Sequence, residues 1–191
     1  VKRYIIMNKN LRNAVLAGNW KMNKTRSEAK ALISDILPLA KDAKCDVVIC
    51  VPYTNLETAI ELTKGTNVKV GAQNCHFEKS GAFTGEVSAP MLKEMGVGYV
   101  VLGHSERRQY FGETDEMVNL KVHKTIEAGF TPILCIGETK EERETNQTND
   151  VLKTQLVGGL KDVSKDDLGK ILFAYEPVWA IGTGKTATPE Q

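Results

Sequence analysis

Short runs of apolar, largely β-branched residues alternate along this chain with longer segments in which apolar positions recur at helical spacing. Within the runs, apolar residues follow one another without alternating polar ones, which is typical of strands buried on both faces. Such strands form parallel sheets, and the segments between them are long enough to cross over as helices. The runs that predict strands span residues 14–19, 46–51, 67–72, 99–103, 132–137 and 171–176.

The segments between these runs carry the start and stop signals of helices. Thr25 and Glu28 have the spacing of a capping box, and so do Thr54 and Glu57 after the second run. Gly129 is expected to end a later helix. The helices are expected over 25–40, 54–63, 88–96 and about 114–128, with a broken helical region to about residue 160.

The composition fits one ordinary globular domain, because the 191 residues are 41% hydrophobic and 26% charged, with a net charge of +1. Charges of both signs are interleaved, so neither nucleic acid nor an anionic membrane is expected as a partner. No apolar run approaches the ~20 residues of a membrane span. We expect one domain over 14–191, preceded by an N-terminal extension, 1–13, of unknown role.

The four cysteines, Cys45, Cys50, Cys75 and Cys135, show no CxxC spacing. Two of them, Cys50 and Cys135, lie inside predicted strands, where a reduced thiol packs as a small hydrophobe. The expected location is therefore the cytoplasm, where thiols stay reduced, and no metal site is expected.

Six strand–helix periods allow two architectures, a doubly wound open sheet or a (β/α)8 barrel. A dinucleotide-binding open sheet should show G-x-G-x-x-G after its first strand, but "GNWKMN" stands there, which favours the barrel. In either fold, polar residues just beyond the carboxyl ends of the strands form the functional face. The residues at these positions are Asn19, Lys21, Gln73, Asn74, His104, Glu106 and Glu176.

Three of these positions suggest acid–base chemistry on an anionic substrate. His104 precedes a short helical turn, whose N-terminus disfavours the imidazolium, so we expect a neutral ring rather than an ordinary loop histidine. Glu176 follows an apolar strand, where partial burial would raise the pKa of its carboxyl toward that of a general base. The alternative for Glu176 is a strand-end salt bridge. Lys21, otherwise a surface lysine, would supply positive charge beside them.

Two loops have unusual compositions. Residues 177–185 place Trp179 and Ile181 beside a glycine-containing segment, which is typical of a closing lid or, alternatively, of a hydrophobic loop anchor. Residues 73–86 form a long loop with apolar Phe77 and Phe83. We expect it to insert into a partner subunit rather than to be a mobile surface excursion.

Taken together, "AGNWKMN", "GAQNCH…GAFTGE", "VLGHSERR", "ILCIGE" and "AYEPVWAIGTGK" resemble the triosephosphate isomerase family, in order from about Ala14 to the end. The resemblance implies a (β/α)8-type barrel of which this chain holds about six units. It also implies the interconversion of dihydroxyacetone phosphate and glyceraldehyde 3-phosphate, in glycolysis and gluconeogenesis, with no cofactor and no metal. The chain ends on Thr188 and Gln191, which have the spacing of a third capping box and predict a helix start there.

The resemblance also assigns roles to residues. It implies that Glu176 is the base and His104 the neutral electrophile, with Lys21 and Asn19 over the substrate oxygens and Glu106 beside them. It implies that loop 177–185 is a lid whose Gly182 reaches the phosphate. The other lid residues named by the resemblance are Trp179, Ile181 and Thr183.

The family is a homodimer, so the resemblance implies a dimer or higher oligomer formed through loop 73–86. In the family this loop, represented here by Gln73, Phe83, Thr84 and Glu86, supports the neighbouring subunit's Lys21 and Asn19. Because two of eight barrel units are expected to be missing, with the phosphate loops that follow strands seven and eight, an inactive relative that folds and oligomerises is the alternative. A different phosphate-binding barrel enzyme is a third reading, which the lid and "GHSERR" argue against.

Overall fold

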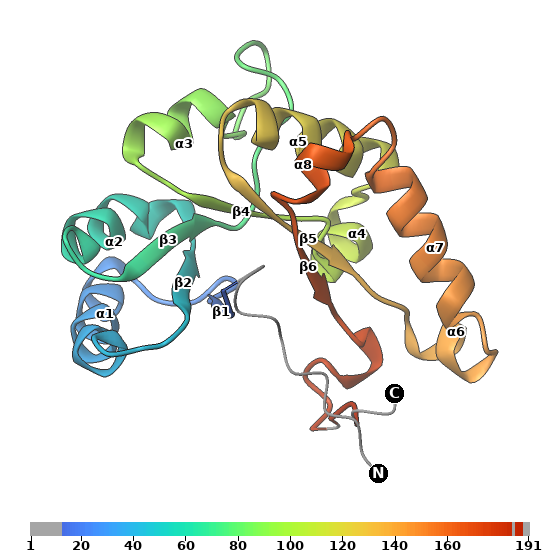
Figure 1. Cartoon of the computed structure of the whole chain (residues 1–191), viewed down its shortest axis with the longest axis horizontal. Helices are drawn as coiled ribbons and strands as arrows, with labels where there is room; N and C mark the ends of the chain where they lie inside the picture. The colour runs from blue at the N-terminus through green and yellow to red at the C-terminus, as the bar shows by residue number, and fades with distance from the viewer. Residues whose placement is uncertain (1–12, 185, 189–191) are drawn as a thin grey trace. The chain divides into compact units, whose positions relative to one another are not determined.

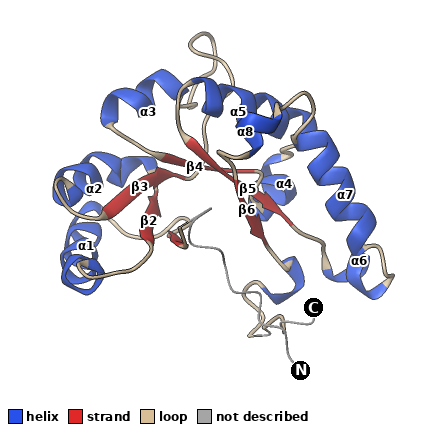
Figure 2. Ribbon diagram, viewed as in Figure 1, coloured by secondary structure: helices blue, strands red, loops and turns tan. Residues whose placement is uncertain are grey.

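The structure, a computed structural model, describes residues 13–184 and 186–188. They form two units, one of residues 13–73 with 94–99 and one of residues 74–93 with those from 100 onward. In both, red strands and blue helices alternate along the chain in Figure 2. Residues 1–12 of the predicted extension lie outside the described ranges, and so does Gln191, the second member of the capping box predicted with Thr188.

The first unit contains a parallel sheet in the order β1-β2-β3. Every residue of β2 after its first is buried, which confirms the prediction of a strand covered on both faces. Helix α1 packs on α2, and α2 packs on β3 (Figure 1). The elements are β1 (Val15–Asn19), α1 (Arg26–Ala40), β2 (Asp46–Val51), the 3-10 turn η1 (Tyr53–Asn55), α2 (Leu56–Thr63) and β3 (Val68–Ala72).

Of the two predicted capping boxes in this unit, one forms. The N–H of Thr25 donates to Glu28 Oε2 at 2.8 Å, which confirms the first box at the start of α1. The second, at Thr54 and Glu57, is wrong because Thr54 lies within η1 and α2 begins only at Leu56. Its N-cap residue, Asn55, instead uses its side-chain N–H to hold the carbonyl of Lys24 at 2.8 Å.

The second unit has β4, β5 and β6 as successive neighbours, and β5 pairs with β6 in parallel. Helices α5 and α7 pack on each other and on β5, whose last five residues are buried (Figure 1). The helix that we expected to end at Gly129 does so, with that glycine at φ +79°. The strands are β4 (Tyr99–Leu102), whose first residue belongs to the first unit, β5 (Thr131–Ile136) and β6 (Leu172–Tyr175).

Helices separate these strands along the chain. The broken helical region predicted to about residue 160 is confirmed as α6 and α7, whereas α8, capped by the Ser164 side chain, was not predicted. The helices are α3 (Ala89–Met95), α4 (Ser105–Phe111), α5 (Asp115–Glu127), α6 (Lys140–Glu144), α7 (Thr148–Gly159), α8 (Lys165–Leu168) and the 3-10 turn η2 (Val178–Ala180).

Strands β1 and β6 are less covered than predicted. Four of the five residues of β1 are exposed, including Leu16 at 65%, and β6 exposes Phe173 and Tyr175. Among the described strands β1 has β2 as its sole neighbour and β6 has β5. The expectation that all six strands are buried on both faces is therefore wrong for these two edges.

Of the helices in the described ranges, none is both long and apolar enough to cross a membrane.

Candidate active site

His104 caps helix α4 directly after β4. Its Nδ1 accepts a hydrogen bond from the N–H of Glu106 at 3.2 Å, so that nitrogen carries no proton and the proton of a neutral ring lies on Nε2. The side chain is only 8% exposed. The carboxylate of Glu106 is 3.7 Å from the same Nδ1 and is partly exposed. The predicted helical turn after His104 is thus confirmed, and it orients the ring.

Glu176 follows β6 and reaches the same point. Its Oε1 lies 2.8 Å from His104 Nε2, and its Oε2 accepts the N–H of Ser105 at 3.0 Å. Its main chain is also fixed, because its N–H donates to the Ile136 carbonyl at 2.7 Å. The alternative of a strand-end salt bridge with Lys or Arg finds no support among these contacts.

The electrostatics of Glu176 differ from the prediction. Burial raises the pKa of the carboxyl, but hydrogen bonds from His104 and the Ser105 N–H lower it by more, so the pKa lies below its ordinary value. The prediction of a raised pKa is therefore wrong for this arrangement. The partner that lowers it is His104, which a reading of single residues does not pair with Glu176.

Asn19 and Lys21 stand at the end of β1 in the first unit. Lys21 adopts φ +53°, a left-handed conformation that is strained for a residue with a side chain. Its N–H donates to Asn19 Oδ1 at 3.0 Å, and its carbonyl accepts Gln73 Nε2 at 3.0 Å. Gln73 therefore holds Lys21 of its own chain, instead of belonging with the exposed part of loop 73–86.

The residues of the predicted lid, which follow Glu176, begin with a firmly held turn. The indole of Trp179 donates to Glu138 Oε1 at 3.0 Å and lies 4.8 Å from the guanidinium carbon of Arg143. The hydroxyl of Thr183 bonds the carbonyl of Trp179, and Ile181 is half-buried. Trp179 thus serves as the anchor that the sequence offered as an alternative. Gly182 is exposed at φ +71°, and Lys185 lies outside the described ranges.

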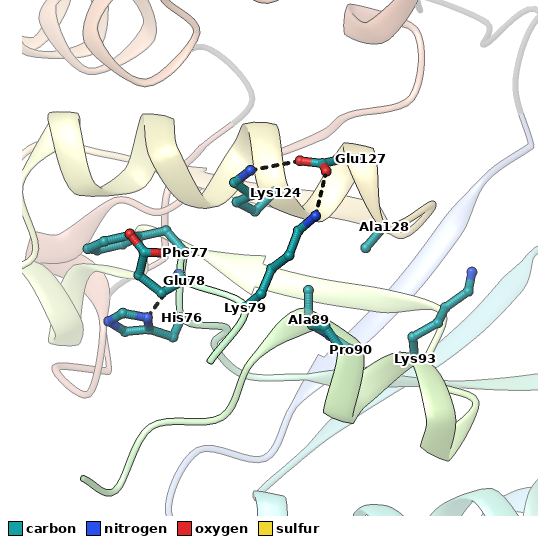
Figure 3. A pocket seen from close by; sticks show the side chains of 10 residues that line it. All are labelled: His76, Phe77, Glu78, Lys79, Ala89, Pro90, Lys93, Lys124, Glu127 and Ala128. Atoms are coloured by element: carbon teal, nitrogen blue, oxygen red, sulfur yellow. Dashed lines mark hydrogen bonds and ion pairs between the residues drawn. The ribbon is translucent and has the colours of Figure 1, made fainter. Parts of the chain in front are cut away.

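Loop 73–86 is exposed from Glu78 to Glu86 and projects at the top of Figure 1. The base of the loop is fixed by two interactions. The N–H of His76 donates to the Val87 carbonyl, and Lys79 forms an ion pair with Glu127 of α5 at 3.2 Å. A cavity of about 270 Å³ lies between this base, α3 and α5 (Figure 3). Neither His104 nor Glu176 lines that cavity, so it is separate from the candidate active site.

The comparisons with known proteins agree with this geometry. The family model for triosephosphate isomerase matches residues 14–191. The chain belongs to the triosephosphate isomerase family. It is 60% identical to the triosephosphate isomerase of Clostridium botulinum (strain ATCC 19397 / Type A) over 181 residues. These aligned residues make up 95% of this chain and 73% of that protein. The Clostridium novyi (strain NT) protein of the same name is 55% identical over 95% of this chain and 72% of its own length.

The crystal structure of triosephosphate isomerase from Bartonella henselae superposes with a TM-score of 0.82 at 43% identity, covering 88% of this chain and 69% of that one. This likeness confirms the predicted fold class, a parallel α/β chain of the (β/α)8 barrel type with six β/α units. Within the described part of the chain, no three His, Cys, Asp or Glu side chains are grouped as metal ligands would be.

Glu138 is the residue of this site that sequence reasoning missed. It is fully buried and accepts bonds from Tyr175, Trp179 and Arg143. Burial raises the pKa of its carboxyl, but these hydrogen bonds lower it by more, so it lies below the ordinary value. The signal was present, because Glu138 directly follows the fifth apolar run and Glu176 ends the sixth.

Proposed function

We propose that this chain interconverts dihydroxyacetone phosphate and glyceraldehyde 3-phosphate, as a triosephosphate isomerase. Membership of the family supports the reaction class, and one observation supports the assignment of the chemistry: the 2.8 Å contact between His104 Nε2 and Glu176 Oε1. A proton donor and a carboxylate that share one buried point can act on neighbouring atoms of a small substrate.

In the proposed mechanism, Glu176 takes a proton from one substrate carbon and returns it to the next. His104, neutral with its proton on Nε2, donates a hydrogen bond to the carbonyl oxygen and stabilises the charge that develops there. That oxygen then takes the Nε2 proton while the ring nitrogen takes the hydroxyl proton from the neighbouring carbon, so the two substrate oxygens exchange roles. The same N–H now bonds Glu176, so a substrate oxygen that takes it also removes the bond that lowers the pKa of Glu176. Burial of the carboxylate then makes it a stronger base when substrate is present.

The remaining roles are proposals that rest on position. Lys21 is proposed to place positive charge near the substrate oxygens, with Asn19 fixing its backbone and Glu106 fixing the His104 ring. Gly182 is proposed as the phosphate contact of the lid, because it is exposed and a glycine N–H can approach an anion closely. Ile181, Thr183 and Trp179 would shape that lid.

We also propose that the chain forms a homodimer through loop 73–86. Phe83 is 43% exposed at the projecting tip, with Thr84 and Glu86 exposed beside it. The His76 ring stacks on Phe77 with 4.3 Å between ring centroids, and its centroid lies 4.4 Å from that of Phe83. These contacts order the aromatic side chains of the loop before any partner binds. A preorganised aromatic side chain is typical of a protein interface.

A cytoplasmic location is likewise a proposal. All four cysteines are free thiols and three of them are buried, as expected of a protein that stays in a reducing compartment.

The reaction is tested with a coupled assay on the purified full chain, checked by mass and free of host isomerase. Conversion of glyceraldehyde 3-phosphate with kcat/KM above ~10⁴ M⁻¹s⁻¹ supports the proposal. A His104→Gln variant prepared in the same way reports any contaminating activity. Absence of turnover above that control would overturn the proposal, and it is the result that the inactive alternative predicts.

The dimer is tested by sedimentation of the wild type and of Phe83→Asp at micromolar concentration. We expect the variant to shift to a lower mass, because a charge replaces the aromatic side chain that the proposed interface would bury. Val157→Asp, at a 66% exposed position on α7, is the matched control. A wild type that sediments as a monomer contradicts the proposal.

A further inference from the structure

The side chain of Arg108 holds the peptide unit that precedes His104. Its Nε donates to the carbonyl of Gly103 at 2.8 Å, whereas the carbonyl of His104 accepts the main-chain N–H groups of Arg107 and Arg108, at 2.8 and 3.1 Å, which any residue at these helix positions would supply. Because a carbonyl lies in the plane of the peptide unit that follows its residue, the bond from Nε fixes the peptide plane between Gly103 and His104. We propose that Arg108 is a positioning residue, which sets the orientation of the His104 ring for the reaction proposed above.

The guanidinium is itself anchored at its other end. Its Nη1 lies 2.6 Å from Oδ1 of Asp115, the first residue of α5, and the two side chains are 18% and 21% exposed. Asp115 in turn has little room, because a Cβ added at Gly158 of α7 would lie 2.7 Å from the Asp115 Cβ. Through the planar fork of Arg108, the end of β4 is therefore connected to α5 and indirectly to α7.

Gly103 is packed against the same guanidinium. It adopts φ +68°, the left-handed region that favours glycine, at the sharp turn from β4 into α4. A Cβ at this position would lie 2.9 Å from Arg108 Nη2 and 3.3 Å from the carbonyl oxygen of Cys135. The guanidinium thus occupies the space that a side chain at residue 103 would need. Any change at Arg108 alters the support of this turn.

The ring depends on that support because it has two exacting hydrogen bonds. Nδ1 accepts the Glu106 N–H at 3.2 Å and Nε2 lies 2.8 Å from Glu176, so the ring plane must satisfy both. Lysine at position 108 would keep the positive charge but offers one flexible ammonium, which cannot reach Gly103 and Asp115 with the geometry of the fork. A ring displaced by about 1 Å can lose roughly 100-fold in rate.

Arg107 offers a matched control on the same helix. Its Nε is 3.5 Å from Glu113, and its guanidinium carbon lies 5.1 Å from the Phe111 ring. The side chains of the two neighbours thus serve different partners. Replacing each arginine by lysine makes the same chemical change, but only one of the two replacements removes the support at Gly103.

The inference rests on the proposed function, so the test includes a readout that needs no turnover. NMR of the histidine ring nitrogens, assigned with His104→Gln, is recorded on the full chain for the wild type, Arg108→Lys and Arg107→Lys. We expect Arg108→Lys to shift or broaden the Nε2–H resonance of His104 and to lower kcat by about 10- to 100-fold, with KM changed by less than about threefold. Arg107→Lys should leave both as in the wild type.

Ring resonances and kcat unchanged in Arg108→Lys would overturn the inference, even if the melting temperature fell. An inactive wild type would defeat the proposed function alone, since the resonances still report on Arg108. If Arg108→Lys fails to fold, Asp115→Asn weakens one anchor by removing its charge and retains the bond to Gly103. It should move the same resonances by a smaller amount, and unmoved resonances would count against Arg108.

Discussion

Candidate catalytic residues lie at two places, one where β4 and β6 end and the other where β1 ends. The two places hold these residues differently. His104 and Glu176 have side chains only 8% and 16% exposed, bonded to each other and to the start of α4. Asn19 ends β1, a strand that is mostly exposed, and the half-buried Lys21 follows two residues later with its main chain bonded to Asn19 and Gln73. The acid–base pair is therefore more deeply buried than the end of β1, where main-chain bonds hold the backbone of Lys21.

The difference has a physical consequence for each group. A buried carboxylate responds strongly to each hydrogen bond, which is why the pKa of Glu176 is lowered despite the opposing effect of burial. Lys21 is only half-buried, so its charge is partly screened by salt. We therefore expect substitutions at the buried pair to act on the chemical step, and substitutions at Lys21 to act on binding.

The largest expected effect is that of Glu176→Asp. Shortening the side chain by one methylene withdraws the carboxylate from His104 Nε2 and from the reacting carbons. We expect kcat to fall by about 100-fold or more with little change in KM, measured by steady-state kinetics. An unchanged kcat would remove Glu176 from the role of base.

Lys21→Met should have the next largest effect. Loss of one charge-assisted hydrogen bond, about 1.5–3 kcal/mol, should lower kcat/KM by roughly 10- to 100-fold, mostly through KM. In the wild type, KM should rise as ionic strength increases from 0.01 to 0.15 M, where the Debye length falls from about 30 to about 8 Å. Equal losses in kcat and kcat/KM would show that Lys21 acts in the transition state, as the buried pair does.

The control for this variant is Lys24→Met. Lys24 is exposed on the same segment and also has positive φ, at +75°, and its main-chain carbonyl accepts the Asn55 side chain. The substitution changes charge equally but should leave KM within about twofold.

The parts of the molecule that local signals determine could be predicted from the sequence. The box at Thr25 and Glu28 closes within one turn, and Gly129 needs only its own backbone conformation, so both predictions were correct. The predicted capping box at Thr54 and Glu57 does not form, because a 3-10 turn precedes the helix and makes Asn55 the N-cap residue. The Asn55 side chain in turn donates to the carbonyl of Lys24, which is 31 residues away in the sequence.

In the candidate active site, too, local features could be predicted from the sequence, whereas features that depend on distant residues could not. Strand ends identified His104 and Glu176, since position along the chain is enough for that inference. The direction of the pKa shift of Glu176 and the role of Glu138 depend on which side chains meet in space. His104 and Glu176 are 72 residues apart, and Glu138 and Trp179 are 41 apart. Patterns within a dozen residues carry no information on such pairs.

Glu138→Gln should destabilise the turn at Trp179, whose indole bonds Glu138, and the effect should depend on pH. Because the folded pKa of Glu138 lies below its ordinary value, its contribution to stability is present above the ordinary glutamate pKa, about 4.3, and is lost as pH falls through the folded value. In a Trp20→Phe background, Trp179 fluorescence should change below about pH 4.3. The glutamine variant should lack that transition and lose about 1–3 kcal/mol of unfolding free energy at neutral pH. A titration retained in the variant would show that another group anchors Trp179.

The smallest expected effect is that of a truncation on the edge strand β1. It is compared with the truncation of an apolar side chain on an interior strand. Val48 is 1% exposed in β2, and Val48→Ala should lower the unfolding free energy by about 1–3 kcal/mol through lost burial and a cavity. Leu16 is 65% exposed in β1, so Leu16→Ala, although it removes more atoms, should cost less than about 0.5 kcal/mol. Both are measured by urea unfolding at low and high protein concentration. If Leu16→Ala costs as much as Val48→Ala, and the cost grows with concentration, β1 is covered by a second chain in solution. The contrast between an exposed edge and a buried interior would then hold only for the isolated subunit, and Asn19 and Lys21 would be as firmly enclosed as the pair at β4 and β6.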